Sequence, residues 1–297
     1  MDSAKLIKKI EEVFREKTKY LFDKHVPEFN VNGKFLGDFF SQLAVEPRGE
    51  EPPVFYYTYS PFDVISNKAP QRAAVFASGE MLLEVDFDQY TALRTAAMSS
   101  VVMPTVNITS LAEKRILLLG AGNIATKSLG FLKAAYPELD KVACISRSGD
   151  LKKITSEAKK LGIELVAGNL EDIGQYDIII CHTQADAPVL TEDQRSNIKS
   201  GAFIASFISS TEHGELADTY FNSSQANVIC DWELTIRGAK EIERSIADGQ
   251  LRQDDVIFLN DLLTGKKTID QSKAYTIYRS TGTPIQNMAV LQLLLEK

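Results

Sequence analysis

Two glycines and an alanine are spaced so that a backbone turn could hold a phosphorylated ligand. They occur in the run Gly120-Ala121-Gly122-Asn123-Ile124-Ala125, which follows a short apolar run and opens a segment with helical spacing. In such a pattern the first glycine permits a tight turn, the second lets the backbone approach a pyrophosphate, and the alanine lets helix and strand pack closely. The pattern alone is weak evidence, but a second strand follows at a suitable distance. The run therefore predicts a dinucleotide site whose pyrophosphate binds the free N–H groups that open the helix.

The end of that second strand carries the residues that would meet the adenosine ribose. The run Ser146-Arg147-Ser148 stands where an Asp or Glu would accept the ribose hydroxyls of NAD. An arginine with two serines suits a 2′-phosphate instead, because a guanidinium pairs strongly with phosphate oxygens. The alternative is that Arg147 is an exposed loop residue that stacks on adenine. We expect NADP(H) to be preferred, with NAD(H) as the alternative cofactor.

From residue 115 onward, strand and helix patterns alternate. Short apolar runs predict strands at 116–119, 142–146, 164–167, 178–181, 203–207 and 228–230. Helical spacing follows at 124–135, 151–161 and 239–248, and a final apolar helix is expected at 285–295. This succession predicts an α/β fold, a Rossmann-type doubly wound parallel sheet.

Residues 1–105 mix helix and strand signals. An amphipathic helix is expected at 3–17, followed by a turn-rich stretch from Pro27 to Gly49 that includes Asn32-Gly33. Strands are expected at 54–59, 73–77 and 81–85, and a helix begins at Asp88 and is closed by Pro104. The first part of the chain is therefore expected to form an α+β region of its own.

Charge and composition narrow the classes of function. The net charge of −7 argues against binding to nucleic acid or to an anionic membrane, because both need clustered Lys and Arg. Cys144, Cys181 and Cys230 are widely spaced among apolar residues, which predicts buried reduced thiols and no metal site. No apolar run is long enough to span a membrane and no export signal is seen, so the expected location is the cytoplasm.

Four segments, taken in order, resemble the ornithine cyclodeaminase/μ-crystallin family. They are Thr91-Ala92-Leu93-Arg94-Thr95-Ala96-Ala97 with Ser99 after it, the run from His182 to Leu190, the run from Ile198 to Ile204, and Tyr278-Arg279-Ser280-Thr281-Gly282-Thr283. The resemblance covers roughly residues 80–297. It implies a discontinuous dimerisation and substrate domain (1–108 with 275–297) around a dinucleotide-binding domain (109–274), and a homodimer.

The resemblance also implies a chemistry, namely hydride exchange between a nicotinamide and the α-carbon of an amino or imino acid. We expect an NAD(P)H-dependent oxidoreductase acting on such a small-molecule substrate by imine reduction, amino-acid dehydrogenation or opine-type condensation. The alternatives are an ornithine-type cyclodeaminase and a non-catalytic protein of μ-crystallin type that binds NADPH and a small ligand.

Site residues carry over by position. Arg94 would bind the substrate carboxylate, because a guanidinium pairs with both oxygens of a planar carboxylate; the alternative is a salt bridge on the helix surface. Thr95 and Thr183 would contact the cofactor, and Ser280 and Gly282 would line the nicotinamide pocket. With Gly120, Gly122, Asn123, Ile124, Ser146, Arg147 and Ser148, these residues make up the expected cofactor site.

Two departures from the family pattern concern proton transfer and substrate binding. Ser210 stands nearest the family's acid–base Asp, and a serine is a weak base near neutral pH. The family's substrate lysine has no clear match near Val54, and Lys68 is the nearest candidate. Both departures weigh against ornithine cyclisation. Glu212 and His213 are the candidate acid–base replacements, unless both are exposed loop residues, and His182 is interpreted as structural or cofactor-lining.

Overall fold

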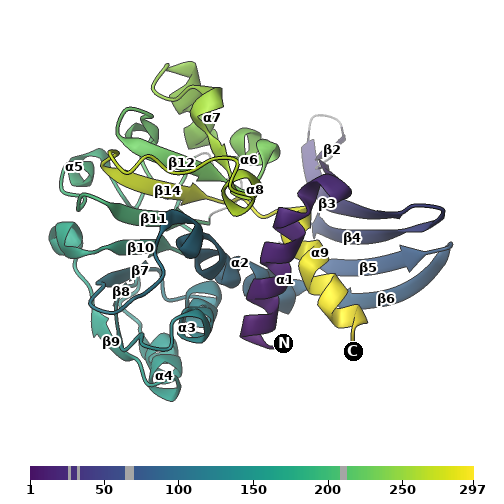
Figure 1. Cartoon of the computed structure of the whole chain (residues 1–297), viewed down its shortest axis with the longest axis horizontal. Coiled ribbons are helices and arrows are strands. Elements are labelled where there is room, and N and C mark those ends of the chain that lie inside the picture. The colour runs from purple at the N-terminus through teal and green to yellow at the C-terminus, as the bar shows by residue number, and fades with distance from the viewer. Residues whose placement is uncertain (26–27, 32–33, 64–69, 208–212) are drawn as a thin grey trace. The chain divides into compact units, whose positions relative to one another are not determined.

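The computed structural model describes residues 1–25, 28–31, 34–63, 70–207 and 213–297. The chain divides into two compact units, and Figure 1 shows the elements of each along the colour ramp. The first unit joins Met1–Arg94 to Thr283–Lys297, and the second is the continuous segment Thr95–Gly282. The first unit is thus built from both ends of the chain, and each unit is described by itself.

The second unit is built on one parallel sheet of eight strands, in the order β13-β12-β14-β11-β10-β7-β8-β9. Every residue of β7 and β10 is buried, as is typical of strands with both faces covered. The strands are β7 (Ile116–Leu119), β8 (Lys141–Ile145), β9 (Glu164–Ala167), β10 (Ile178–Cys181), β11 (Ala202–Ser206), β12 (Ala226–Cys230), β13 (Ile257–Phe258) and β14 (Tyr275–Arg279). The predicted Rossmann-type sheet is therefore confirmed.

Strand order in this sheet reverses next to β7. From β7 the chain proceeds outward through β8 and β9, and then returns to place β10 and β11 on the other side of β7. Ligands of such sheets bind outside the carboxyl ends of the strands at this reversal. The helices of the unit are α3 (Asn123–Ala135), α4 (Lys152–Lys160), α5 (Glu192–Arg195), α6 (Glu233–Gly238), α7 (Lys240–Ala247) and α8 (Leu259–Leu263), together with most of α2 (Asp88–Val102).

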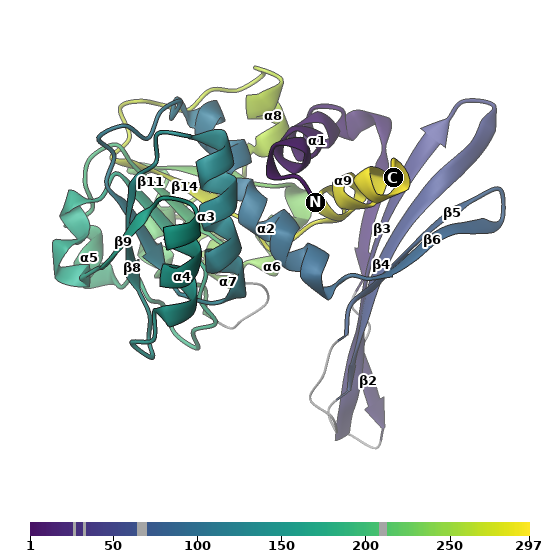
Figure 2. The ribbon, with the colours of Figure 1, turned by 90° about the horizontal axis from the view of Figure 1, so that it is seen from below.

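The first unit is an antiparallel sheet packed against two helices. The strand order is β1-β3-β4-β5-β6, and β2 also pairs with β3. Figure 2 shows α1 and α9, which contact each other, on one face of this sheet, with α9 touching β3 and β4. The elements are α1 (Ser3–Arg15), β1 (Leu21–His25), β2 (Glu28–Val31), β3 (Lys34–Arg48), β4 (Glu51–Asp63), β5 (Arg72–Ala77), β6 (Glu80–Asp86) and α9 (Pro284–Leu295).

The stretch expected to be rich in turns is mostly strand. It contains β2 and β3, and β3 pairs with β1 and β2 on one side and with β4 on the other. The pairing with β4 becomes irregular between Glu46 and Arg48, around Pro47. Proline lacks the N–H that a regular ladder needs, which accounts for the irregularity. Tertiary pairing outweighs the local turn signals here.

The borders of the compact units differ from the predicted domain borders, which fell after residues 108 and 274. The strand β14 was expected in the substrate domain, yet it is hydrogen-bonded between β11 and β12 in the middle of the parallel sheet. The chain leaves this unit only after Gly282, and it enters the unit within α2. The prediction assigned this strand to the substrate domain because it lies close to the last helix in the chain. Its hydrogen bonds to β11 and β12 instead make it part of the parallel sheet.

The three cysteines are free and buried, as predicted. Burial raises the pKa of the Cys144 thiol to about 11, so the thiol stays protonated near neutral pH. Within the described ranges, no three His, Cys, Asp or Glu side chains gather where a metal ion could bind. Nor does any helix in those ranges combine the length and the apolar composition needed to cross a membrane.

Candidate dinucleotide site

A pocket of about 680 Å³ lies at the carboxyl ends of β7, β8, β10 and β11. It therefore opens where the strand order reverses, at the position expected for a ligand of such a sheet. Its walls come from the segments that follow β7, β8, β9, β10 and β11, and they include Gly120, Gly122, Asn123, Ile124, Ser146, Arg147, Ser148 and Thr183. The structure thus brings eight of the predicted cofactor residues together in one cavity.

The two glycines of the loop after β7 have different reasons to be glycine. Gly120 has a φ of +104°, and a Cβ there would lie 2.3 Å from the carbonyl oxygen of His182. A side chain at Gly120 would push β7 and β10 apart. A Cβ on Gly122 would meet no described atom within 4 Å, so this glycine faces open space at the start of α3. That space is a cradle into which a phosphate group would fit.

The loop after β8 presents hydroxyl groups and a guanidinium to the same pocket. Arg147 and Ser148 are exposed, and Ser146 is half-buried. The hydroxyl oxygens of Ser146 and Ser148 lie 3.0 Å apart. The pocket therefore has hydrogen-bond donors and one positive charge at this end, with no acid among these three residues.

His182, interpreted from the sequence as structural or cofactor-lining, forms part of the wall after β10. Its Nε2 lies 2.7 Å from the Ser128 hydroxyl oxygen, and its ring stacks on Phe207 with centroids 4.7 Å apart. Burial lowers the pKa of the imidazole to about 3, so the ring is neutral at physiological pH. The ring therefore lines the pocket as a neutral group, and its cofactor-lining role stays a prediction.

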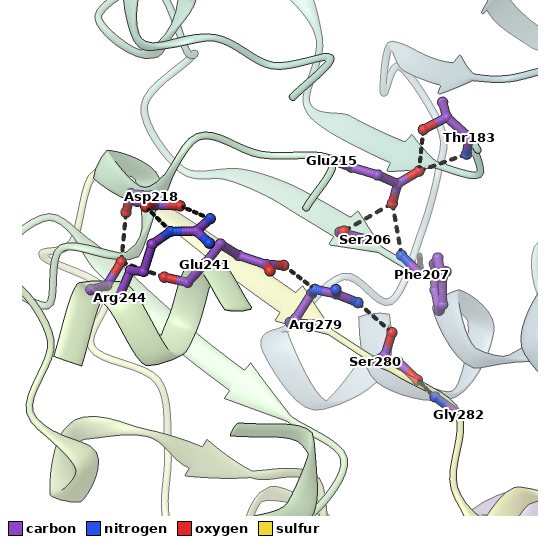
Figure 3. A network of polar contacts seen from close by, with 11 residues as sticks. Thr183, Ser206, Phe207, Glu215, Asp218, Glu241, Arg244, Arg279, Ser280 and Gly282 are labelled. Atoms are coloured by element: carbon purple, nitrogen blue, oxygen red, sulfur yellow. Dashed lines mark hydrogen bonds and ion pairs between the residues drawn. The ribbon is translucent and has the colours of Figure 1, made fainter. Parts of the chain in front are cut away.

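A buried carboxylate missed by sequence reasoning holds this wall in place. Glu215 is fully buried, and Figure 3 shows its two oxygens reaching the ends of β10 and β11. One oxygen accepts from the amide of Thr183 at 2.6 Å and from its hydroxyl at 2.7 Å. The other accepts from the Ser206 hydroxyl and the Phe207 amide, each at 2.9 Å. The sequence signal for Glu215 was its place five residues after Ser210, the residue nearest the family's acid–base Asp.

A second buried network lies around β14, and Figure 3 shows its members Glu241, Arg279, Ser280 and Gly282. The guanidinium of Arg279 donates to Glu241 at 2.5 Å and to the Ser280 carbonyl at 2.6 Å. The Ser280 hydroxyl donates to Asp231 at 2.5 Å and accepts from the Gly282 amide at 3.3 Å. Among the described residues, those lining the pocket do not include Ser280, Gly282 or Thr95.

The predicted substrate and acid–base residues are spread over the chain. Arg94 is buried, with 9% of its surface exposed, and its Nη1 donates to Gln286 at 2.9 Å within the first unit. It is therefore not a helix-surface residue. His213 is exposed. Lys68, Ser210 and Glu212 lie outside the described residues, so their predicted roles stay predictions.

Comparison with known proteins identifies the class and then the family. The parallel sheet with a pocket at its strand reversal defines a Rossmann-type fold. The chain belongs to the ornithine cyclodeaminase/mu-crystallin family, whose pattern matches residues 72–297. A curated relative, the iminosuccinate reductase of Paracoccus denitrificans (strain Pd 1222), is 26% identical over 223 residues, or 74% of this chain and 67% of the relative.

Solved structures share the fold over almost the whole chain. The crystal structure of that reductase with NAD+ has a TM-score of 0.83 at 21% identity, over 100% of this chain and 92% of the other. The Δ1-pyrroline-2-carboxylate reductase of Thermococcus litoralis, with NADH and L-proline, gives 0.80 at 19% identity over 100% and 93%. An archaeal alanine dehydrogenase dimer with bound NAD gives 0.79 at 19% identity over 100% and 91%.

Proposed function

We propose that this chain is an NAD(P)H-dependent oxidoreductase acting on the carbon–nitrogen bond of an α-imino or α-amino acid. The observation that carries the proposal is the pocket at the strand reversal, lined by the glycine loop and by the residues after β8 and β10. Support comes from two relatives whose names state imino-acid reduction and whose structures hold NAD+ or NADH. Family membership by itself allows several reactions, and these names favour reduction of C=N.

The proposed chemistry assigns distinct tasks to residues of the chain. Bound NAD(P)H supplies a hydride to the imine carbon, and the nitrogen takes a proton. The start of α3 would hold the pyrophosphate, because Gly122 leaves its backbone open on that side. Arg94 would bind the substrate carboxylate, with Gln286 fixing one edge of its guanidinium. A positioned acid would protonate the nitrogen, and His213 and Glu212 are the candidates by their place in the family motif.

A turnover assay tests this proposal directly. Purified protein is incubated with NADPH or NADH and a preformed cyclic imino acid, or with an amine and a 2-oxo acid, and cofactor oxidation is followed by absorbance. Oxidation that requires the imine, or the pair that forms it, supports the proposal. Release of ammonia from ornithine without net cofactor use would instead identify a cyclodeaminase. Enhanced fluorescence of bound NADPH with neither reaction would identify a binding protein.

The cofactor preference is a separate proposal that rests on the loop after β8. Arg147 with the neighbouring serines would bind a 2′-phosphate, so NADPH should bind more tightly than NADH. Replacing Arg147 by Ala should weaken NADPH binding about tenfold or more and change NADH binding little, since one charge-assisted contact is lost. Arg252→Ala is the matched control, because Arg252 is an exposed arginine of the same unit paired with Asp255. Equal dissociation constants for both cofactors in the unmutated protein would contradict the preference.

The proton donor is tested by replacing His213 with Ala. A positioned acid contributes roughly 100- to 10,000-fold, so kcat should fall within that range while cofactor affinity stays the same. His25→Ala is the control, because His25 is an exposed histidine of the first unit. An unchanged kcat in His213→Ala would remove His213 from the mechanism and leave Glu212 to be tested in the same way.

We also propose that the protein is a homodimer formed through the first unit. Strand register places Leu21, Val45, Phe55, Phe76 and Met81 in one row across β1, β3, β4, β5 and β6. Paired residues share a face, so this row is an apolar stripe, and Leu21, Phe55 and Met81 are 65%, 39% and 55% exposed. Apolar surface of this kind marks an interface, and a second copy is the proposed occupant because one relative is described as a dimer.

A further inference from the structure

We infer that Glu215 is a positioning residue for the nicotinamide side of the pocket, where its carboxylate fixes Thr183 and the backbone of Phe207. Both of these residues line the pocket, and Glu215 itself does not. The inference rests on the proposed binding of a dinucleotide there. Glu215 would contribute to that binding only through the residues that it holds in place.

The carboxylate bridges two adjacent strands just beyond their last pairs. The β10–β11 pairing runs to Cys181 and Ser206, and Thr183 and Phe207 follow these ends. An amide that leaves a sheet in the interior must find another acceptor, because a buried N–H without one is costly. Glu215 provides that acceptor for both strands at 2.6 and 2.9 Å. The carboxylate therefore links the two strand ends beyond their last pair.

Only an ionised carboxylate suits this arrangement. Four donors converge on two oxygens, and a carboxylate accepts at both oxygens while donating nothing. A glutamine of the same size would turn an NH2 group toward two of these donors. A charged acceptor also forms stronger hydrogen bonds than a neutral one. Glu215→Gln therefore removes the carboxylate that accepts these four hydrogen bonds, without creating a cavity.

The main chain of Glu215 ties down a further part of the same wall. Its carbonyl accepts from the amides of Val189 and Leu190 at 2.8 and 3.0 Å, and Val189 lines the pocket. The His182 ring, stacked on Phe207, completes the contact between the two strand ends. The side chain and the backbone of one residue therefore hold three segments of the wall.

The side of the pocket that depends on Glu215 follows from strand order. The half of the sheet made by β7, β8 and β9 receives the first nucleotide of a dinucleotide, and the half beyond the reversal receives the second. Because β10 and β11 lie beyond the reversal, Glu215 supports the nicotinamide half. Among the described residues, the carboxylate of Glu215 bonds to Thr183, Ser206 and Phe207, and not to the glycine loop or the Ser146–Ser148 loop on the adenosine half. A positioning role therefore predicts weaker binding on the nicotinamide half alone, whereas a general loss of structure would weaken binding on both halves.

The test compares whole and half ligands. We expect Glu215→Gln to raise the Kd of NADPH about tenfold or more, and to change the Kd of 2′,5′-ADP by less than about twofold. The KM for the cofactor should rise by a larger factor than kcat falls. The control is Asp177→Asn, since Asp177 is a partly buried carboxylate of the same unit that pairs with Lys199, directly precedes β10 at the strand's other end and is not among the residues that line the pocket. That variant should leave both dissociation constants unchanged in the folded protein.

A second variant is available, and two outcomes would contradict the inference. If Glu215→Gln does not fold, Ser206→Ala carries the test, because the Ser206 hydroxyl donates to Glu215 and its loss removes one of the four donors. It should raise the Kd of NADPH by a few-fold and spare 2′,5′-ADP. Unchanged NADPH binding in these variants, or equal loss of both ligands, would overturn the inference. If the unmutated protein binds neither NADPH nor NADH, the proposed function itself fails.

Discussion

The buried ion pair between Arg279 and Glu241 should be a major determinant of stability in the second unit. Both side chains are only 1% exposed, and the donor and acceptor lie 2.5 Å apart. Glu241→Gln removes the carboxylate from a guanidinium that stays buried beside β14. Removing one partner of such a pair costs about 3–5 kcal/mol, a large share of the roughly 5–15 kcal/mol that stabilises a typical domain.

The same loss of stability should appear as a lower melting temperature. For a unit of this size, each kcal/mol shifts Tm by roughly 2–4 °C, so Glu241→Gln should lower Tm by about 6–20 °C. Equilibrium unfolding in urea measures the free energy, and the slope with denaturant should stay constant if only stability has changed. The double variant Glu241→Leu with Arg279→Met replaces both charges by apolar groups. It should recover at least about 2 kcal/mol relative to the sum of the single variants, since buried pairs can be exchanged for apolar residues at little cost.

The pair also borders two segments with expected functions, which makes the stability test informative about the site. A Cβ on Gly214 would lie 2.4 Å from the Glu241 carboxylate, so Gly214, which precedes Glu215 in the chain, packs against Glu241. Arg279 holds the carbonyl of Ser280, one of the expected nicotinamide contacts. A loss below about 1 kcal/mol in Glu241→Gln, or no recovery in the double variant, would show that the pair is not an energetic unit.

Three further predictions follow from other parts of the structure. Because the pKa of His182 is about 3 in the folded protein and 6.5 when unperturbed, unfolding takes up a proton at acid pH, and stability falls as pH drops below about 6.5. Between pH 6.5 and 4.5 the protein should lose about 2.3 kcal/mol more than His182→Phe in denaturant unfolding, and equal losses would contradict the assignment. Arg94→Ala should raise the KM of the imino acid roughly 10- to 150-fold, and Gln286→Glu should raise it as well by placing a carboxylate on the guanidinium, both with cofactor affinity unchanged. An unaltered KM in Arg94→Ala would refute its role as the carboxylate anchor. Sedimentation at micromolar concentration should give a dimer that Phe55→Asp with Met81→Asp dissociates, whereas a stable monomer before mutation would exclude the proposed interface.

Sequence by itself determined those features whose signals lie within a few consecutive residues. Fully buried strands read as continuous apolar runs, so 116–119 and 178–181 were recognisable as strands, with the same bounds in the structure. The glycine loop is also a local signal, because turn, helix start and strand packing all involve adjacent residues. The ordered family motifs added the expected chemistry and most of the expected site residues.

Tertiary structure decided the features that join residues far apart in the chain. Arg94 and Gln286 are separated by 192 positions, and Thr183 and Glu215 by 32. The long strand β3 forms because β1, β2 and β4 satisfy its backbone, although its own residues include turn formers. The buried carboxylates of Glu215 and Glu241 look like ordinary surface acids in the sequence. Their roles appear only when folding surrounds them with donors, because a carboxylate can be buried only where its charge is met by hydrogen bonds or a cation.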